Sequence, residues 1–372
     1  MKIAYVNSIC HRYDAISNAI RDEIGWLMEA GHDVRLFAYS CDFEDFPYPY
    51  SRVDNELDVA FHPFFQDCDL AVFHFGVYYP LFNLLPLVPL GARRVVVFHN
   101  ITPKAHLPAA SHALIDKSFA QVSNIAFAHH AVCDSETNLA VLREAGVTTP
   151  ASVLPLAVHA DLRMPAAKPS FADGVLRVLF IGRLVQSKGP LEFLQALEDL
   201  LVRMPGLQVR ADMVTNFKFC SEVLVEAVKA RIERLAADHR ARLALNLVAN
   251  APEDLKQALL RDADLFVLPT YHEGFCVPIL EALASGCKVI AYDNSNTPAV
   301  SGGLSTLVPT GDTAALGNAI CEAAATVAGS QWREAGYAAA GEAAQRHLRT
   351  FSVPAVRKRF LDFIEQQGAG RR

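Results

Sequence analysis

The sequence lacks the short motifs that mark several common classes of enzyme. No two of its eight cysteines form a CxxC pair, and no two of its thirteen histidines form an HExxH pair, so a zinc site is not expected. The glycine-rich motif GxGxxG does not follow the first predicted strand, KIAYV. Its absence argues against a nicotinamide-dependent oxidoreductase, although such an enzyme would share the same broad fold class.

Long apolar runs and an excess of positive charge are also missing. The longest apolar stretch, residues 76–91, is shorter than the roughly 20 residues that span a bilayer, and prolines interrupt it. We expect this stretch to be buried against a sheet or in a substrate-site wall rather than in a membrane. The net charge of −6 gives no reason to expect nucleic acid as a partner. The opening residues MKIAYV are typical of a strand rather than a signal peptide, so the expected compartment is the cytoplasm.

The composition is that of a large globular protein whose charge is unevenly distributed. Hydrophobic residues make up 52% of the 372 residues and charged residues 20%, which favours a large core and two domains. Residues 1–160 contain 10 Lys and Arg against 17 Asp and Glu, a charge of −7, and the remaining residues carry +1. An acidic first half is weakly repelled by an anionic membrane surface.

Short apolar runs alternate with helix-like segments along both halves of the chain. The runs interpreted as strands are KIAYV, DVRLFAY, DLAVFHF, RRVVVFHN and ASVLPLAV, followed by LRVLFIGRL, LQVRADMV, LALNLVA, DLFVLPT and CKVIAYD. Such alternation predicts parallel sheets with helices on both faces. Residues 161–174 are rich in proline, alanine and polar residues and are interpreted as a linker. The expected fold class is α/β, with two doubly wound, Rossmann-like domains facing a cleft.

The end of the chain, VPAVRKRFLDFIEQQ, predicts an amphipathic helix. Its apolar residues recur at the three- and four-residue spacing of one helical stripe. The residues expected on that stripe are Val356, Phe360, Phe363 and Ile364.

Two glutamates flank a turn in the stretch YHEGFCVPILEALASGCKVIAYD, which starts at residue 271. Pro278 suits the first turn of a helix that follows the strand DLFVLPT. Glu273 is therefore expected at the carboxyl end of a strand, where open α/β sheets bind ligands, and Glu281 about one turn into the helix.

The backbone N–H groups of Gly274, Phe275 and Cys276 gather near the start of that predicted helix. A helix N-terminus favours an anion, whereas the neighbouring carboxylates suit the hydroxyl groups of a sugar. A nucleotide-sugar has both a diphosphate and a polyhydroxylated end. A helix cap beside a solvated glutamate explains the same spacing equally well.

A second stretch, FIGRLVQSKGP, places Arg183 just beyond a strand and Lys188 five positions later. A guanidinium and an ammonium group suit a phosphate, although two exposed cations alone would be ordinary. Taken with the paired glutamates, they favour a nucleotide-sugar site.

Together, these two stretches resemble the donor-binding half of glycosyltransferase family 4, whose members are retaining enzymes with the GT-B fold. GRLVQSKG is similar to the family's Gly-Arg-Leu…Lys-Gly signature. EGFCVPILEALASGCKVIA is similar to its paired-glutamate signature, with Cys276 where glycine is common. HRYDAISNAI, VVVFHNITP, AVCDSETNLAVLREAG and SVLPLAV extend the resemblance to one branch, the bacterial surface-polysaccharide mannosyltransferases. The first loop departs from the broader family, which has a glycine pair there.

The resemblance also assigns the domains. Residues 1–160 would form an acceptor-binding domain, onto which the terminal helix, residues 354–368, crosses back. After the linker at 161–174, residues 175–353 would bind the donor.

The resemblance implies the following roles. Arg183 and Lys188 neutralise the diphosphate. Glu273, with the N–H groups of Gly274 and Phe275, holds the sugar hydroxyls. Beside these groups, the donor-binding residues include Cys276, Glu281 at the ribose, and Asn250 near the base. In the first domain, the main chain at Asp14, Ala15 and Ile16 is expected to contact phosphate.

His99 is expected to face the anomeric carbon, which makes it a catalytic residue together with Glu273, Arg183 and Lys188. A histidine at the end of a strand is also often a hydrogen-bonded wall residue. The other histidines of the first half, His74 among them, are interpreted as solvated or core residues.

The implied reaction moves a sugar, with retention, from a nucleoside diphosphate sugar to a hydroxyl of a saccharide or polyprenyl-linked acceptor. GDP-mannose is the first expected donor, and polysaccharide or lipopolysaccharide biosynthesis the expected setting. No carboxylate nucleophile is identified, which favours same-face attack assisted by the departing phosphate. No metal or other cofactor is expected, because the DxD-like pairs that start at Asp67 and Asp262 each directly precede a strand.

Membrane contact is expected to be peripheral at most, at the inner face of the plasma membrane. A GT-B epimerase, a sugar phosphorylase and a catalytically silent binding subunit remain as alternatives. The silent subunit is disfavoured because both phosphate cations are present.

Overall fold

The computed structural model describes residues 1–12, 14–43, 47–161 and 163–369, which leaves Leu162 of the predicted linker and Tyr13 of the first loop outside the described residues. The chain divides into two compact units. Unit 1 comprises Met1–Ala157 with Val353–Arg372, and unit 2 comprises Val158–Ser352.

Unit 1 is built on a parallel sheet of seven strands in the order β5-β3-β1-β6-β7-β8-β9. The strands are β1 (Lys2–Val6), β3 (Asp33–Ala38), β5 (Tyr50–Arg52), β6 (Leu70–Phe75), β7 (Arg93–Phe98), β8 (His130–Cys133) and β9 (Ala151–Val153). A small parallel pair, β2 (Ile9–Cys10) and β4 (Ser40–Cys41), extends from it. The strand order reverses between β1 and β6, and open α/β sheets bind ligands at the carboxyl ends of strands at such a position.

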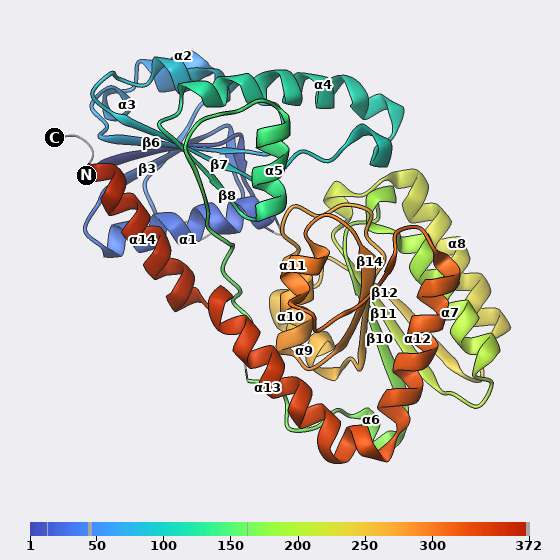
Figure 1. Cartoon of the computed structure of the whole chain (residues 1–372). Helices are drawn as coiled ribbons and strands as arrows, with labels where there is room; N and C mark the ends of the chain where they lie inside the picture. Colours follow the sequence, from blue (N-terminus) through green and yellow to red (C-terminus); the bar gives the residue numbers. More distant parts are fainter. Residues whose placement is uncertain (13, 44–46, 162, 370–372) are drawn as a thin grey trace. The chain divides into compact units, whose positions relative to one another are not determined.

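Helices cover both faces of this sheet. On one face lie α1 (Ala15–Glu29) and α14 (Val353–Ala369) (Figure 1). On the other lie α2 (Glu56–Ala60), α3 (Pro63–Gln66), the 3₁₀ helix η1 (Pro80–Leu87), α4 (His112–Gln121), the 3₁₀ helix η4 (Val122–Phe127) and α5 (Glu136–Glu144). Neighbouring residues of a strand point to opposite faces, so Tyr5 packs with α1 while Val6 packs with η1.

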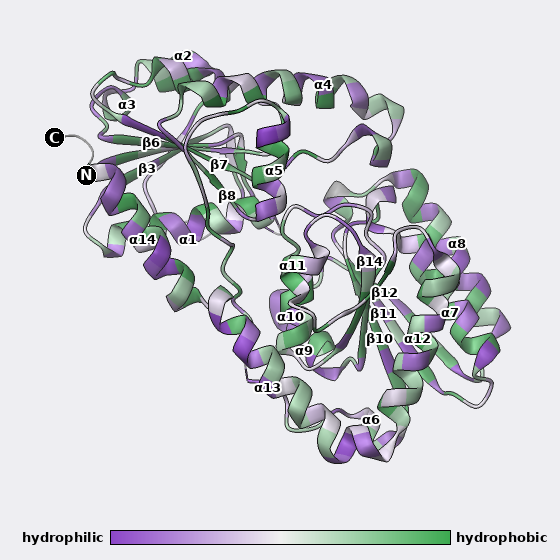
Figure 2. Cartoon of the chain, in the orientation of Figure 1, coloured by the Kyte–Doolittle hydropathy of each residue, from purple (hydrophilic) through white to green (hydrophobic). Residues whose placement is uncertain are grey.

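The C-terminal helix α14 belongs to unit 1, as the resemblance implied. All four residues of its predicted stripe are buried, and the Trp26 ring of α1 lies 6.0 Å from the ring of Phe360. Figure 2 shows the corresponding alternation of green and purple along α14.

The apolar stretch 76–91 forms η1 and its flanks. Leu81, Phe82, Leu84 and Leu85 are buried in the core, which confirms the expected burial against the sheet, whereas Leu87 and Leu90 are exposed. Among the helices formed by the described residues, none is both long and apolar enough to cross a membrane.

Unit 2 contains six parallel strands in the order β12-β11-β10-β13-β14-β15. The strands are β10 (Leu176–Ile181), β11 (Val209–Thr215), β12 (Leu243–Ala249), β13 (Leu265–Leu268), β14 (Lys288–Asp293) and β15 (Thr306–Pro309). This order reverses between β10 and β13.

Helices also flank the second sheet on both sides (Figure 1). One side carries α7 (Pro190–Arg203), α8 (Glu222–Asp238) and α12 (Thr313–Ala328). The other carries α9 (Glu253–Asp262), α10 (Val277–Ala284), α11 (Thr297–Ser301) and α13 (Tyr337–Leu348). The expected α/β class with two doubly wound sheets is confirmed.

The part of residues 161–174 that the structure describes packs within unit 2. Lys168 is 3% exposed, and its Nζ donates to the carbonyl oxygens of Arg261 at 2.8 Å and Ser285 at 2.7 Å. These carbonyls end α9 and α10, where helices leave acceptors unpaired. Burial lowers the pKa of Lys168. Through its two hydrogen bonds, the amine of Lys168 connects this segment to the ends of both helices. A short helix, α6 (Ser170–Asp173), follows.

Candidate functional site

Two loops of unit 2 leave the strands on either side of the point where the strand order reverses. Residues 182–189 follow β10, and residues 269–276 follow β13. The backbone N–H of Tyr271 donates to the carbonyl oxygen of Ser187 at 2.8 Å, and the Thr270 hydroxyl donates to the same oxygen at 3.1 Å. The parallel sheet and these bonds bring the two predicted motifs to one edge of unit 2.

Gly189 is the residue that permits this close approach. Its φ is 63°, and a Cβ at this position would lie 2.1 Å from the carbonyl oxygen of Pro269. The glycine thus brings one loop against the other, directly before α7 starts at Pro190.

Lys188 and Glu273 meet across the two loops. Lys188 Nζ lies 2.5 Å from Glu273 Oε1, and their side chains are 18% and 9% exposed. Arg183, on the same loop as Lys188, is exposed, and its guanidinium makes no hydrogen bond or ion pair with the part of the chain that the structure describes. The loop therefore carries one cation that is paired with a carboxylate, Lys188, and one whose charge is available to a ligand, Arg183.

Phe275 and Cys276 lead directly into α10. Phe275 is 7% exposed, and its ring centroid lies 5.9 Å from that of Phe351. The side-chain amide of Asn296 donates to its carbonyl oxygen at 2.8 Å. Gly274 lies between these residues and Glu273 in the same loop. This packing fixes the backbone at the predicted anion site.

Cys276 occupies the N-cap of α10 with φ of 79°, a left-handed conformation that favours glycine. Its thiol is buried, and burial, followed by the charge of Glu273, raises its pKa well above the usual value. Such a thiol is a poor nucleophile. Cys276 therefore shapes the turn in this structure.

Glu281 lies in the second turn of α10 and is 7% exposed. Its Oε1 accepts a hydrogen bond of 2.9 Å from Nζ of Lys256 in α9. Burial raises the pKa of Glu281, and Lys256 opposes that rise. Sequence reasoning missed Lys256, because only the packing of α9 against α10 places it beside the carboxylate.

Asn250 directly follows β12 and has a φ of 52°. Its backbone N–H donates to the Thr215 carbonyl oxygen at 2.8 Å, and its side-chain oxygen accepts from the N–H of Phe217 at 3.2 Å. The exposed residue is thus fixed against the loop after β11. It lies at the carboxyl edge that also carries Lys188 and Glu273.

The predicted phosphate loop of unit 1 forms the start of α1. Asp14 is the N-cap, and its carboxylate accepts from the N–H of Ser17 at 2.9 Å and from the Ser17 hydroxyl at 2.7 Å. Ala15 is exposed and Ile16 half-buried at the first positions of the helix. Asp14 therefore caps the helix, and the main-chain contact to phosphate remains a prediction.

His99 lies just after β7, with its side chain 4% exposed. Nδ1 lies 2.6 Å from Asp134 Oδ2, and Nε2 lies 2.8 Å from His74 Nδ1. Both ring nitrogens are therefore hydrogen-bonded within unit 1. A contact between His99 and a sugar remains a prediction. Because both ring nitrogens already have partners, the sugar would have to share one of these two hydrogen bonds.

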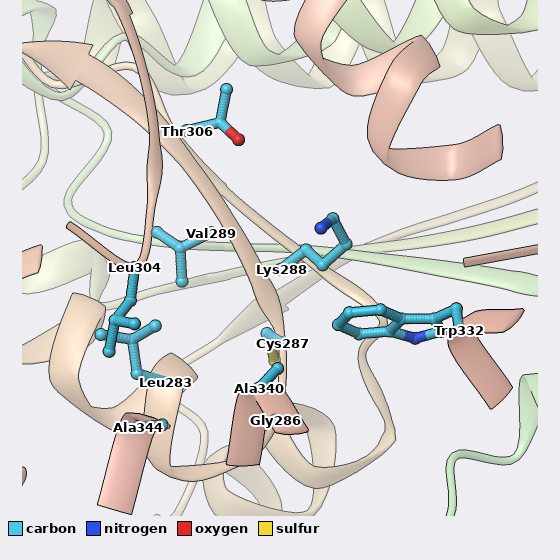
Figure 3. Close-up of a pocket in the computed structure, with 10 residues that line it drawn as sticks. All are labelled: Leu283, Gly286, Cys287, Lys288, Val289, Leu304, Thr306, Trp332, Ala340 and Ala344. Carbon is cyan, nitrogen blue, oxygen red and sulfur yellow. The ribbon is translucent and has the colours of Figure 1, made fainter. Parts of the chain in front are cut away.

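A small cavity lies at the opposite, amino edge of the unit 2 sheet (Figure 3). Its volume is about 100 Å³, and the starts of β14 and β15 line it together with α13. Lys288 Nζ lies 4.7 Å from the centroid of the Trp332 ring, and burial lowers the pKa of this lysine. None of the predicted site residues, all of them among the described residues, lines this cavity. It is separate from the candidate site.

Part of the chain is similar in sequence to known proteins. Residues 176–326 match the family model of glycosyl transferases, group 1. A D-inositol 3-phosphate glycosyltransferase of Corynebacterium jeikeium (strain K411) is 33% identical over 133 residues, which are 36% of this chain and 31% of the relative. The chain thus aligns with about a third of the length of this curated relative.

Solved structures resemble nearly the whole chain. A glycosyltransferase from Rickettsia africae ESF-5 has a TM-score of 0.74 and 15% identity, with 98% of both chains covered. An α,α-trehalose-phosphate synthase (UDP-forming) from Burkholderia vietnamiensis has a TM-score of 0.72 and 15% identity, with 99% of this chain and 98% of that chain covered. The fold is GT-B, as the sequence resemblance implied.

Proposed function

We propose that the protein is a retaining glycosyltransferase whose unit 2 binds a nucleoside diphosphate sugar. The observation that carries this proposal is the pairing of Lys188 with Glu273 at the carboxyl edge of β10 and β13. Ligands of open α/β sheets bind where the strand order reverses. The match of residues 176–326 to glycosyl transferases, group 1, supports the same function.

In this proposal, the diphosphate contacts Lys188 and Arg183. These cations stabilise the charge that develops on the leaving diphosphate, so they act chiefly in the transition state. The carboxylate of Glu273 accepts hydrogen bonds from the sugar hydroxyls, with the N–H groups of Gly274 and Phe275 beside it. The buried Glu281 accepts from the ribose hydroxyls.

GDP-mannose is the first donor that we propose, with a saccharide or lipid-linked acceptor of a surface polysaccharide or lipopolysaccharide. The curated relative is named for D-inositol 3-phosphate, which makes a phosphorylated polyol the second class of acceptor to test. These choices concern the chemistry of the substrates and leave the roles of the unit 2 residues unchanged.

A panel of nucleoside diphosphates and nucleotide sugars tests the proposal by thermal shift. A ligand at 100 times its Kd stabilises the folded protein by about 2.7 kcal/mol. We expect one nucleoside diphosphate to stabilise the wild-type protein and to have no effect on Lys188→Met. If no member of the panel stabilises the wild type, the proposed donor site is wrong.

Product analysis then separates transfer from the alternatives. A transferase releases the nucleoside diphosphate in proportion to the acceptor that is added. An epimerase alters the sugar without an acceptor. We expect release to depend on the acceptor, and acceptor-independent turnover would favour the epimerase.

A further inference from the structure

Four buried side chains of unit 1 form an unbroken hydrogen-bonded chain at the carboxyl edge of its sheet. His74 Nε2 lies 3.1 Å from Glu23 Oε2, and His74 Nδ1 lies 2.8 Å from His99 Nε2. His99 Nδ1 then lies 2.6 Å from Asp134 Oδ2. The side chains of the four residues are at most 11% exposed. Since β6, β7 and β8 are adjacent, their carboxyl ends place His74, His99 and Asp134 side by side.

The number of protons in this chain follows from its three contacts. An ionised carboxylate only accepts hydrogen bonds, so the contacts with Glu23 and Asp134 each need one proton. The contact between the nitrogens of His74 and His99 needs a third. Two neutral imidazoles supply two protons, so the four groups together hold one more and carry a net charge of −1. This count is the same wherever along the chain the additional proton resides.

The surroundings favour retention of the additional proton. Burial lowers the pKa of His99, but the charge of Asp134 and its hydrogen bond to the ring, together with the charges of Glu23 and Asp14, outweigh burial, and the pKa of His99 is raised. Tyr5 of β1 donates its hydroxyl to Glu23 Oε2 at 3.0 Å, and burial raises the pKa of this tyrosine well above its usual value.

The backbone around the histidine pair is also fixed. The Tyr79 hydroxyl, at the start of η1, donates to the His74 carbonyl oxygen at 2.7 Å. The two imidazole planes lie within 18° of each other. A Cβ added at Gly76, just after β6, would lie 3.5 Å from His99 Cβ.

We propose that His74 and Glu23 are positioning residues for His99, which hold its ring through one shared proton. When that proton is lost at high pH, the lone pairs of His74 Nδ1 and His99 Nε2 face each other and the contact separates. His99 then loses its fixed orientation, and transfer decreases on the alkaline side. The link to transfer rests on the proposed function, whereas the shared proton does not.

The first test observes the proton directly and needs no substrate. In the full-length protein with ¹⁵N-labelled histidine, the ring resonances of His74 and His99 are followed from about pH 5 to 9 and assigned with His74→Asn and His99→Asn. We expect both rings to change together in one step. Independent titration of the two rings, or two neutral rings throughout, would overturn the proposal.

The second test compares pH profiles of kcat/KM. In His74→Asn, the amide can donate to His99 Nε2, so this contact is satisfied without the additional proton. We expect the alkaline decrease of the wild type to shift upward by at least about one pH unit, with activity at lower pH retained within roughly threefold. A purely structural role would lower the rate equally at every pH, and an unshifted alkaline limb would refute the shared proton.

Two further variants, one at Glu23 and one control, also test the shared proton. In Glu23→Gln, the side-chain amide can donate to His74 Nε2, so two neutral imidazoles satisfy the remaining contacts and the alkaline limb should again move to higher pH. This variant replaces the first if His74→Asn does not fold. An unchanged limb in Glu23→Gln also counts against the proposal. His112→Asn is the matched control, because His112 Nε2 contacts the carbonyl oxygen of Leu107 at 3.1 Å, outside the chain of four groups. If no nucleotide sugar is turned over, the proposed function fails, while the NMR result still decides the shared proton.

Discussion

Lys188 and Glu273 are 85 residues apart in the chain, yet their charged atoms lie 2.5 Å from each other. The pair joins the loop after β10 to the loop after β13, at the place where the strand order of unit 2 reverses. Both side chains are largely buried, so neither charge is fully compensated by water. The ion pair therefore links the stability of the loops to the chemistry proposed for them.

Replacement of Lys188 by methionine is expected to affect both activity and stability. Loss of a cation at the leaving diphosphate should lower kcat by roughly 100-fold or more. The carboxylate of Glu273 would remain buried without its partner, which should lower the free energy of unfolding by roughly 1–3 kcal/mol. Steady-state kinetics and chemical denaturation measure the two effects.

A double variant separates these effects. In Lys188→Met with Glu273→Gln, no unpaired charge is buried, so stability should return to within about 1 kcal/mol of the wild type while activity stays low. Lys229→Met removes an exposed lysine and should change neither quantity. Recovery of activity in the double variant would contradict the role proposed for the cation.

The Lys256–Glu281 pair predicts a pH-dependent stability. Burial raises the pKa of Glu281, so its native carboxyl binds protons more tightly than the unfolded chain does. Stability therefore falls as pH rises from the unfolded pKa through the raised folded pKa. Lys256 limits this loss by favouring the ionised form.

Lys256→Met should make the decrease in stability above about pH 5 steeper than in the wild type. At lower pH, where Glu281 is protonated in both proteins, the two stabilities should converge. Denaturation curves measured at several pH values test this, and adding Glu281→Gln should remove the additional slope. Equal slopes in the wild type and Lys256→Met would show that the amine does not stabilise the carboxylate.

The sequence predicted most strands of the two large sheets, among them β1, β6 and β13, whose apolar runs of four residues or longer are buried. It did not identify β5, β8 and β15 of these sheets as strands, nor the small pair β2 and β4. These five segments contain only two to four residues, and β5 and β15 lie at a sheet edge, where hydrogen bonding to one neighbour defines the strand. Such segments are too short for the alternation of apolar and polar residues along a strand to be detected.

The candidate site could also be predicted only in part from the sequence. Lys188 and Glu273 each followed a predicted strand, which suggested a common edge, but their direct contact depends on β10 lying beside β13. His74 and His99 each end a recognisable strand, so a common edge was predictable for these two, whereas Asp134 follows β8, which the sequence did not identify as a strand. The hydrogen bonds of these residues were not predictable, because the strand order and the packing of α1 decide which side chains meet.

Gly189 offers a test of the contact between the two loops. In Gly189→Ala, the new Cβ would lie 2.1 Å from the Pro269 carbonyl oxygen, in addition to the strain of φ at 63°. Gly303 is the matched control, since its φ is 74° and no atom lies within 4 Å of the added Cβ. We expect Gly303→Ala to lower the free energy of unfolding by about 1–2 kcal/mol and Gly189→Ala by clearly more. Equal losses of unfolding free energy in the two variants would show that the close contact between the two loops does not require glycine at position 189.

Cys276 tests the conformation that begins α10. At φ of 79°, alanine retains the steric strain of a Cβ, while glycine removes it and adds some conformational freedom to the unfolded chain. Both variants lose the buried thiol, so their difference isolates the backbone. Cys276→Gly should therefore be more stable than Cys276→Ala by about 1 kcal/mol. Thermal denaturation measures the difference, and a more stable alanine variant would mean that this turn does not hold a left-handed residue.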